Sequence, residues 1–304
     1  MSDFIKAMER ALNYIEENIC EKIDYNEVAK RAYSSSYHFQ RVFSTTYGIT
    51  LGEYIRRRRL TLAGSELLNS KTKVIEVAVK YGYETPESFS RAFYKFHKIL
   101  PSKVRNGELL KSFSKLTPGD IFNGGKIMDY KIEQKDEKVF VGFKTRFKGV
   151  PYGKERMRQE KSFLTTTRAK QWMLIGASCD HTTDYMIISN VTDDGYDFSV
   201  AYDLDEWTRD NLFNPEVTGI DFMDKMGFEI IVVPKHTYAI FCTQKQRCPI
   251  ADYEDIRKSI IDEWLLTNEY AFANAPEVVA MHWRPKGEWA KERYVEIRIP
   301  IENK

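Results

Sequence analysis

The chain has 304 residues, with 46 Lys and Arg against 44 Asp and Glu, and a formal net charge of +2 at pH 7. Its 42% hydrophobic and 30% charged residues are typical of a soluble globular protein and exclude wholesale disorder. No run of about 18 apolar residues occurs, and the N-terminus lacks the pattern of a secretory signal. We therefore expect a cytoplasmic protein with no membrane partner.

The four cysteines are scattered along the chain and form no C-x-x-C pair (Cys20, Cys179, Cys242 and Cys248). They are expected to be reduced thiols, with no disulfide frame and no zinc site. No Ser-His-Asp order, metal cluster or phosphate loop is visible, so we expect no catalytic residues, no metal and no cofactor.

Positive charge is concentrated in the first third of the chain. Residues 1–110 carry 18 Lys and Arg against 13 Asp and Glu, a balance of +5, and the remainder carries 28 against 31, a balance of −3. A basic excess of this kind is what a phosphate-binding surface needs.

The basic part contains one pattern twice, at 31–43 and at 80–94. Each copy predicts a short helix, a tight turn of small or polar residues, and a second amphipathic helix that ends on Arg-x-Phe. These endings are Arg41-Val-Phe43 and Arg91-Ala-Phe93. Two helix-turn-helix units imply two recognition helices.

Apolar periodicity and capping residues predict the helices of this part in order. They are expected at 3–20 and 25–31, then from a cap among Ser34, Ser35 and Ser36 to about residue 47, and further at 51–68, 74–81, 86–97 and 101–105. Gly48 ends the third helix, and Thr50 caps the fourth. At about 1.5 Å per residue the fourth helix is a rod of roughly 28 Å, comparable to the roughly 34 Å pitch of duplex DNA. It can therefore space the two recognition helices for successive major grooves.

Four consecutive arginines, Arg56 to Arg59, lie on this rod. Successive helical residues differ by about 100°, so the four cannot all face DNA. Two interpretations stay open for them: contact with phosphate, or a solvated face paired with Glu53 or Glu66.

Residues 8–107 resemble the DNA-binding domain of the AraC/XylS family of transcription regulators. The resemblance rests on the stretches 29–43, 48–56, 75–83 and 88–93 and on Pro101. It implies base contacts from Tyr37, Gln40 and Arg41 on the first recognition helix and from Glu87, Ser88 and Arg91 on the second. Ser44, Arg56 and Lys95 complete the expected DNA-binding set. The alternative for Arg41 and Arg91 is an ion pair on the helix surface.

The second part begins after a segment rich in turn residues, 111–127, which we interpret as a linker between domains 1–110 and 128–304. Strands are then expected at 139–147, 185–189, 196–202, 229–233, 237–242, 278–283 and 294–299, with helices at 155–172 and 253–266. The predicted fold class is therefore multi-domain. An all-α double helix-turn-helix domain is followed by an α+β domain of two β-α-β-β repeats with an antiparallel sheet.

Residues 129–302 resemble the GyrI-like effector-binding domain found in some AraC-type regulators. The stretches 233–241, 264–270, 275–276 and 295–300 carry this resemblance. A duplicated unit forms a groove at its seam, and pockets are mostly apolar. The candidate effector-binding residues are Trp172, Tyr185, Tyr238, Trp264, Phe272, Val279, Met281 and Trp283. For each aromatic residue the alternative is an ordinary core position.

Family members that bind cationic drugs use a Glu and a Tyr where this chain has Val279 and Met281. A cation buried without a charge partner is unfavourable. We therefore expect a neutral or anionic aromatic effector, unless Glu229, Glu263 or Glu296 supplies a charge from another direction.

The chain is thus predicted to be a regulator that binds double-stranded DNA and senses a small-molecule effector, with RNA polymerase as a further partner. It is not predicted to be an enzyme. Two alternatives stay open for the second domain: a small hydrolase, or a module that binds or sequesters a protein.

Overall fold

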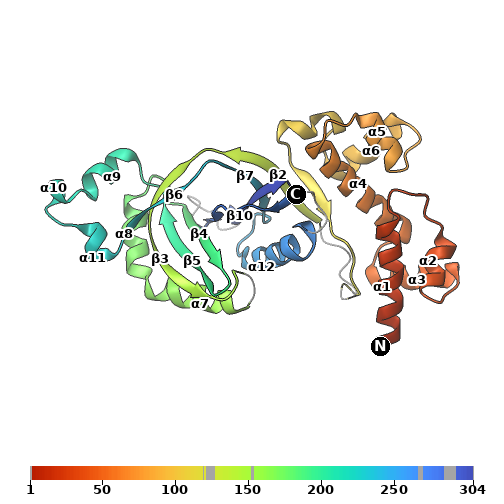
Figure 1. Ribbon diagram of the computed structural model, residues 1–304, viewed down its shortest axis with the longest axis horizontal. Helices are drawn as coiled ribbons and strands as arrows, with labels where there is room; N and C mark the ends of the chain where they lie inside the picture. Colours follow the sequence, from red (N-terminus) through yellow and green to blue (C-terminus); the bar gives the residue numbers. More distant parts are fainter. Residues whose placement is uncertain are drawn as a thin grey trace. The chain divides into compact units, whose positions relative to one another are not determined.

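The computed structural model describes residues 2–118, 120, 127–151, 154–265, 270–283 and 292–303. The chain divides into two compact units (Figure 1). The first comprises Met1–Lys131 with Asp262–Glu269, and the second comprises Ile132–Ile261 with Tyr270–Lys304.

The first unit contains the predicted helices and one strand. They are α1 (Ser2–Glu17), α2 (Tyr25–Arg31), α3 (Ser36–Tyr47), α4 (Leu51–Asn69), α5 (Val74–Lys80), α6 (Pro86–His97), the 3-10 helix η1 (Pro101–Asn106) and β1 (Leu110–Phe113). Helix α4 contacts both α3 and α6. The two helix-turn-helix pairs, α2–α3 and α5–α6, therefore flank one central helix.

Side-chain caps fix where the recognition helices begin. Ser35 accepts a hydrogen bond from the amide of His38 at the start of α3, and Thr85 does the same for Ser88 at the start of α6. Each cap satisfies an amide that the first turn leaves unpaired. Gly48 ends α3 with φ of +70°, as expected for a glycine in the left-handed region.

The segment expected to start the linker is instead bonded to the helices of the first unit. The Lys111 amide donates to His97 Nδ1 at 3.1 Å, and the Phe113 amide donates to Thr61 Oγ1 at 2.9 Å. The Phe113 carbonyl accepts from Arg58 Nη1 at 2.6 Å. Phe113 is buried in the core formed by α1 to α4. Of the predicted linker, residues 119 and 121–126 lie outside the described part.

Strand β2 (Ile127–Lys135) pairs antiparallel with β1, from Tyr130 opposite Leu110 to Ile127 opposite Phe113. The division between the two units falls within this strand, after Lys131. A boundary at residue 110 stays a prediction, whereas the compact unit extends about two strands further.

The second unit is built on an antiparallel sheet with the strand order β2-β7-β10-β9-β4-β5-β3-β6, and β8 pairs with β10. Its strands are β3 (Lys138–Lys148), β4 (Thr183–Thr192), β5 (Gly195–Tyr202), β6 (Glu229–Val233), β7 (His236–Cys242), β8 (Tyr270–Phe272), β9 (Glu277–His282) and β10 (Tyr294–Asn303).

The helices of this unit are α7 (Lys154–Thr166), α8 (Arg168–Ala177), α9 (Glu206–Leu212), α10 (Pro215–Thr218), α11 (Phe222–Met226) and α12 (Ile250–Ser259). The π-helical turn η2 (Ile260–Trp264) follows α12. The single helix predicted over 155–172 is two helices, because Thr167 leaves the helical conformation between them. Helices α9 to α11 were not predicted.

The predicted duplication and fold class are confirmed, with one addition. The predicted repeat gains a strand in front: β2, which was not predicted, leads the first repeat, and β6, expected at 229–233, leads the second. The repeats are therefore β2-β3-α7-β4-β5 and β6-β7-α12-β9-β10. The leading strand of each repeat pairs with the second strand of the other: β2 with β7, and β6 with β3. The repeats meet where β4 pairs with β9. This reciprocal exchange joins the two repeats into one sheet.

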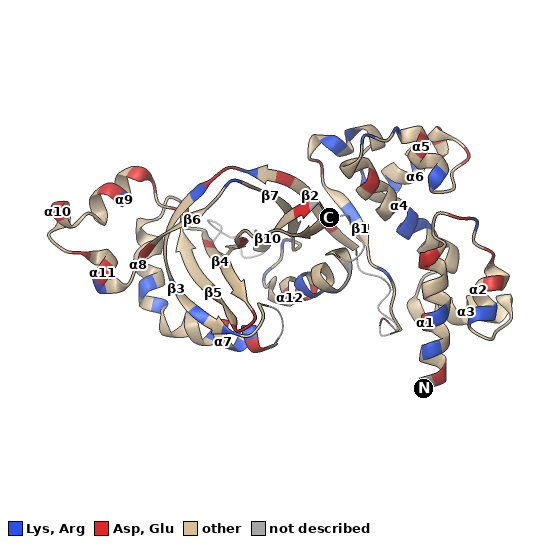
Figure 2. Cartoon of the chain, in the orientation of Figure 1, with Lys and Arg blue, Asp and Glu red and all other residues tan. Residues whose placement is uncertain are grey.

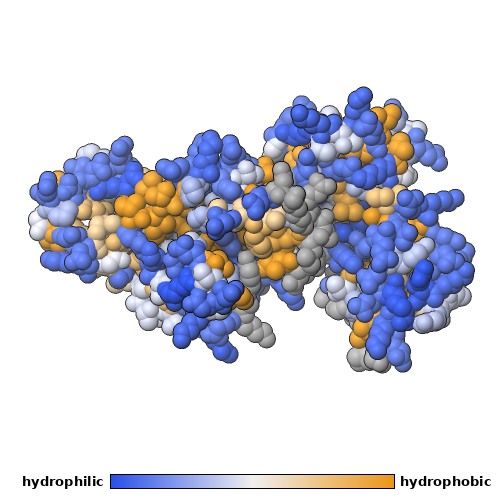
Figure 3. Space-filling view, in the orientation of Figure 1, coloured by the Kyte–Doolittle hydropathy of each residue, from blue (hydrophilic) through white to orange (hydrophobic). Residues whose placement is uncertain are grey.

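Strand β6 forms one edge of this sheet. Figure 3 shows apolar residues gathered over β3 and β6, and Ile230 and Val232 on β6 are about half exposed. On β3, residues Phe140 to Phe143 are all buried, so this part of the strand is covered on both faces.

Two buried ion pairs, one in each repeat, are linked across the repeats because Arg156 also lies 4.0 Å from Glu277 and donates to the Tyr253 hydroxyl on α12 at 3.0 Å. Arg156 on α7 pairs with Glu160, and Arg257 on α12 pairs with Glu277 on β9. Both guanidinium groups also donate to the Pro151 carbonyl, at 2.8 and 3.0 Å. Because the two positive charges are matched by two carboxylates, the cluster is satisfied internally.

The buried imidazole of His97 predicts a pH-dependent stability. Nδ1 accepts from the Lys111 amide, so the proton lies on Nε2, which is 2.9 Å from the Leu60 carbonyl. Burial lowers the pKa of His97 from 6.5 to about 4. The unfolded chain therefore binds one more proton between these values, and stability falls as the pH drops through that window, by about 1.4 kcal/mol per pH unit.

The variant His97→Gln keeps one donor and one acceptor but does not titrate. Urea unfolding at pH 7, 5.5 and 4.5 should show that the difference between wild type and variant changes by about 2.5 kcal/mol over this range. A pH-independent difference would contradict the assignment of a neutral buried His97.

The pair of Arg58 with Glu16 predicts a large stability effect. Arg58 is 1% exposed and lies 2.8 Å from the Glu16 carboxylate. Arg58→Leu should lower the free energy of unfolding by about 3–5 kcal/mol, because it leaves the half-buried Glu16 carboxylate without its cation and the Phe113 carbonyl without its donor. The matched variant Arg56→Leu, on the exposed side of the same helix, should cost about 1 kcal/mol or less. Equal losses in urea unfolding would contradict the distinction.

Candidate nucleic-acid interface and ligand cavity

The first recognition helix, α3, buries one face and exposes the other. Phe39 and Phe43 are buried in the core, whereas Tyr37 is 77% exposed and Arg41 is exposed. Gln40 is half-buried, and its amide donates to Ser36 Oγ at 3.2 Å. The expected contact residues of α3, with half-buried Ser44, thus lie away from the core.

The second recognition helix, α6, follows the same division. Phe89 and Phe93 are buried, and Glu87, Arg91 and Lys95 are exposed. Ser88 is half-buried, and its hydroxyl already donates to the Thr85 carbonyl at 2.8 Å. Its availability to a base is therefore lower than that of its neighbours.

The alternative for Arg41 and Arg91, an ion pair on the helix surface, is not seen among the described residues. Neither guanidinium group lies within 4 Å of a described carboxylate. Figure 2 shows Lys and Arg positions distributed along α3, α4 and α6. Both arginines therefore remain available to an external anion or base.

The four arginines of α4 have different partners. Arg56 and Arg57 both pair with Glu53, as one of the two interpretations expected. Arg58 is buried against Glu16, and Arg59 donates to the carbonyls of Ile19 and Glu21 at 2.8 and 2.6 Å. Only Arg56 of this run is exposed. Arg58 and Arg59 bind α4 to the α1 region, a role that the sequence alone did not indicate.

A cavity of about 670 Å³ lies in the second unit between the helices and the sheet. We call it the seam cavity, because its walls come from both repeats. Its apolar lining consists of Met157, Leu164, Met186, Val200, Tyr202, Ile250, Tyr253, Met281 and Trp283. This volume and lining are within the usual range for small-molecule sites.

The predicted effector residues lie in several places. Met281 and Trp283 line the seam cavity, and Val279 is buried on the same strand, opposite Met186. Tyr185 and Tyr238 are buried in a separate apolar cluster with Ile240. These two therefore occupy the core positions that were their alternative.

The other three predicted aromatic residues also lie outside the seam cavity. Trp172 is 61% exposed on α8. Phe272 lines a smaller cavity of about 210 Å³. Trp264 belongs to the first unit, where its ring packs edge-on against Tyr130 at 5.3 Å. Met186, Val200 and Tyr202 line the seam cavity but were not predicted. The alternation of side chains between the two faces of β4 and β5 would have indicated them.

The seam cavity contains carboxylates that the sequence argument did not identify. Glu160, Asp184 and Glu254 line it, together with the cations Lys161 and Arg168. Of these, Glu160 is neutralised by Arg156. The three acids named from the sequence do not contribute: Glu229 and Glu296 are paired elsewhere and do not line it, and the Glu263 side chain lies outside the described part.

Comparison with known proteins identifies the first unit. A family model described as a helix-turn-helix domain matches residues 28–107. The regulatory protein SoxS of Salmonella typhimurium is 37% identical over 95 residues, which are 31% of this chain and 89% of SoxS. The chain belongs to the AraC family of DNA-binding transcription regulators.

A second AraC-type likeness extends further along the chain. YbfP of Bacillus subtilis, an uncharacterized HTH-type transcriptional regulator, is 25% identical over 262 residues, covering 74% of this chain and 88% of YbfP. Among solved structures, SAV2435 bound to tetraphenylphosphonium covers 57% of this chain and 93% of its own, with 12% identity and a TM-score of 0.42. This structural likeness is too low to support an argument about ligands.

No helix in the described ranges combines the length and the apolar character needed to cross a membrane.

Proposed function

We propose that this AraC-family protein binds a specific operator with α3 and α6 in two successive major grooves. The observation that carries the proposal is the equivalent build of the two helices. Each begins at a side-chain cap, buries a Phe pair and presents an exposed arginine, Arg41 or Arg91, at the same place. The 19-residue helix α4 between them is roughly 28 Å long, close to one duplex turn.

Chemistry assigns a role to each exposed side chain. Arg41 and Arg91 suit guanine, whose O6 and N7 accept two hydrogen bonds, and Gln40 suits adenine. Tyr37, Ser44, Glu87 and Ser88 would contribute further contacts to base edges or sugars. Arg56 and Lys95 would bind phosphate, which positions the protein without reading sequence.

We further propose that the second unit is a GyrI-like sensor whose effector occupies the seam cavity. Its mostly apolar lining supports an effector with a large apolar surface. Because Glu160 is neutralised by Arg156, two carboxylates, Asp184 and Glu254, face two cations, Lys161 and Arg168. The lining charge is therefore balanced, and of the classes expected from the sequence it favours a neutral effector. Both repeats line the cavity, so a ligand would affect the geometry of the whole sheet.

Strand β2 offers a route between the proposed activities. It begins in the first unit, pairs with β1, and continues into the second unit as one uninterrupted strand. Side chains of α4 and α6 form hydrogen bonds with β1. A shift of β2 would therefore be transmitted through β1 to the recognition helices by few contacts. An effector acts on DNA affinity only if it binds two states of the protein differently. We place this regulation, with contact to RNA polymerase, in the cytoplasm.

Selection of DNA from a random pool tests the first proposal. The full chain should enrich a site with two half-sites about one helical turn apart. On that site Arg41→Ala and Arg91→Ala should each weaken binding about 10- to 100-fold, or 1–3 kcal/mol, as measured by fluorescence anisotropy. Each variant should relax base preference in a different half-site.

The charge-matched control for this test is Lys258→Ala, which removes an exposed cation on α12 of the second unit. It should leave operator affinity unchanged within about twofold. An equal loss for all three variants, or no enriched sequence, would contradict specific reading by α3 and α6.

A thermal-shift series on the full chain tests the sensor proposal. Naphthalene carrying a methylammonium, a hydroxyl or a carboxylate provides three compounds of similar size and different charge. A compound at 100 times its dissociation constant should add about 2.7 kcal/mol of stability. We expect the largest shift with the hydroxyl compound and smaller shifts with the two charged compounds, because the balanced lining offers no unpaired charge to either ion.

Trp283→Ala should reduce these shifts because Trp283 lines the seam cavity. Trp172→Ala is the matched control, since this tryptophan is exposed and lies outside the lining. Shifts that vanish in the control and persist in Trp283→Ala would place the ligand elsewhere.

A further inference from the structure

The first unit contains a second cavity, of about 470 Å³, between α4, α6 and strands β1 and β2. We call it the basic cavity. Its charged lining consists of the cations Arg56, Arg57, Arg91, Lys95, Lys98 and Lys111 and of a single carboxylate, Glu53. Six positive charges around one negative charge make a strong attraction for an anion.

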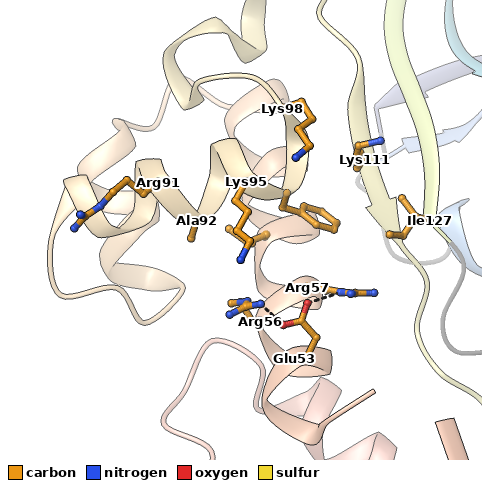
Figure 4. Close-up of a pocket in the computed structure, with 11 residues that line it drawn as sticks. Glu53, Arg56, Arg57, Arg91, Ala92, Lys95, Lys98, Lys111 and Ile127 are labelled. Carbon is orange, nitrogen blue, oxygen red and sulfur yellow. Dashed lines mark hydrogen bonds and ion pairs between the residues drawn. The ribbon is translucent and has the colours of Figure 1, made fainter. Parts of the chain in front are cut away.

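Part of this positive charge has no internal partner. Glu53 pairs with Arg56 and Arg57, and Lys111 pairs with Asp129, outside the lining, at 2.7 Å. No described carboxylate lies within 4 Å of Arg91, Lys95 or Lys98. In Figure 4 the side chains of Lys95 and Lys98 extend from the α6 end toward α4, whereas Arg91 points away from it.

The backbone of Lys98 provides an independent observation. Lys98 ends α6 with φ of +66°, in the left-handed region that side chains with a Cβ disfavour. The equivalent residue at the end of α3 is Gly48, at φ of +70°. The second helix-turn-helix unit thus has a strained lysine at this position, whereas the first has a glycine, which adopts the left-handed region without strain. Strained residues of this kind concentrate at ligand sites, and Lys98 lines the basic cavity.

The floor of the cavity distinguishes between kinds of anion. Leu60, Ala92 and Phe96 provide an apolar surface with an aromatic ring beneath the cations. A single DNA phosphate has no need of an apolar floor, whereas a flat organic anion can bury its ring there. The volume also lies in the usual range for small-molecule sites.

We propose that the basic cavity binds a small aromatic compound that carries an anionic group such as phosphate. The anionic group lies between Lys95, Lys98 and Arg56, and the ring packs on Phe96 and Leu60. Arg56, Arg91 and Lys95 also belong to the proposed DNA surface, a link that rests on the proposed function. Through this shared charge the ligand and the operator weaken each other's binding by the same factor.

Calorimetric titration of the full chain carrying Trp283→Ala, which impairs the seam cavity where 1-naphthol is itself expected to bind, tests the site with 1-naphthyl phosphate as the probe. Inorganic phosphate lacks the aromatic ring of the probe, and 1-naphthol lacks its anionic group. The probe should bind at least about tenfold more tightly than either, because the two halves contribute separately. If inorganic phosphate binds as tightly as the probe, the ring does not pack on the apolar floor. If 1-naphthol binds as tightly, the cations do not bind the anionic group. Either result would overturn the proposal.

Two variants locate the probe. Lys98→Gly removes one cation and relieves the left-handed strain, so the fold is retained, and binding should weaken about tenfold. Arg168→Ala removes a cation of the seam cavity and should leave binding unchanged. Loss in Arg168→Ala with no loss in Lys98→Gly would overturn the proposal.

Binding to the selected operator provides the last test. Saturating 1-naphthyl phosphate should weaken operator binding by wild type and do so less in Lys98→Gly. If the probe gives no heat and Lys98→Gly nevertheless weakens operator binding, the cavity holds a DNA phosphate and the small-ligand proposal falls, while the proposed function stands. If no operator is bound at all, the proposed function falls, and calorimetry alone still decides the basic cavity.

Discussion

The first unit depends most on the contacts of the Arg58 guanidinium group. It is buried, bonded to Glu16 on α1 and to the Phe113 carbonyl at the end of β1. The Tyr54 hydroxyl donates to the same carboxylate at 2.6 Å. One charged network thus joins three segments that are far apart in the sequence. A buried charge is tolerated only when its partners are all present, so these segments are fixed together or not at all.

That network explains why the chain after the second helix-turn-helix unit is part of the DNA-binding unit. Side chains of α4 and α6 bond the amides of Lys111 and Phe113, and Phe113 fills the core. Gly64 has no Cβ, which lets the His97 ring lie against α4; an added Cβ would be 2.9 Å from that ring. The strand is therefore held against both recognition units, and it brings Lys111 to the wall of the basic cavity.

The second unit depends on the interactions that join its two repeats into one domain. Each repeat contributes its leading strand to the other repeat's edge, and Arg156 on α7 joins the repeats through its contacts with Tyr253 on α12 and Glu277 on β9. The Arg156–Glu160 and Arg257–Glu277 pairs leave the rest of the seam mostly apolar. A cavity with walls from both repeats follows from this construction, because helices packed on a twisted sheet leave space where the repeats meet.

The sequence by itself determined the helices of the first unit and the order of most elements in the second, but not β1, β2, β8 or α9 to α11. Capping by one of Ser34 to Ser36, by Thr50 and by Thr85 depends on neighbouring residues, and apolar periodicity depends on a few turns, so both are readable from the chain. Only the tertiary structure decided which side chains meet. It buried Arg58 while leaving Arg56 exposed, moved Tyr185 and Trp264 away from the seam cavity, and gathered Lys98 and Lys111 around one cavity. Contacts between distant segments depend on packing across the whole unit, which no local pattern encodes.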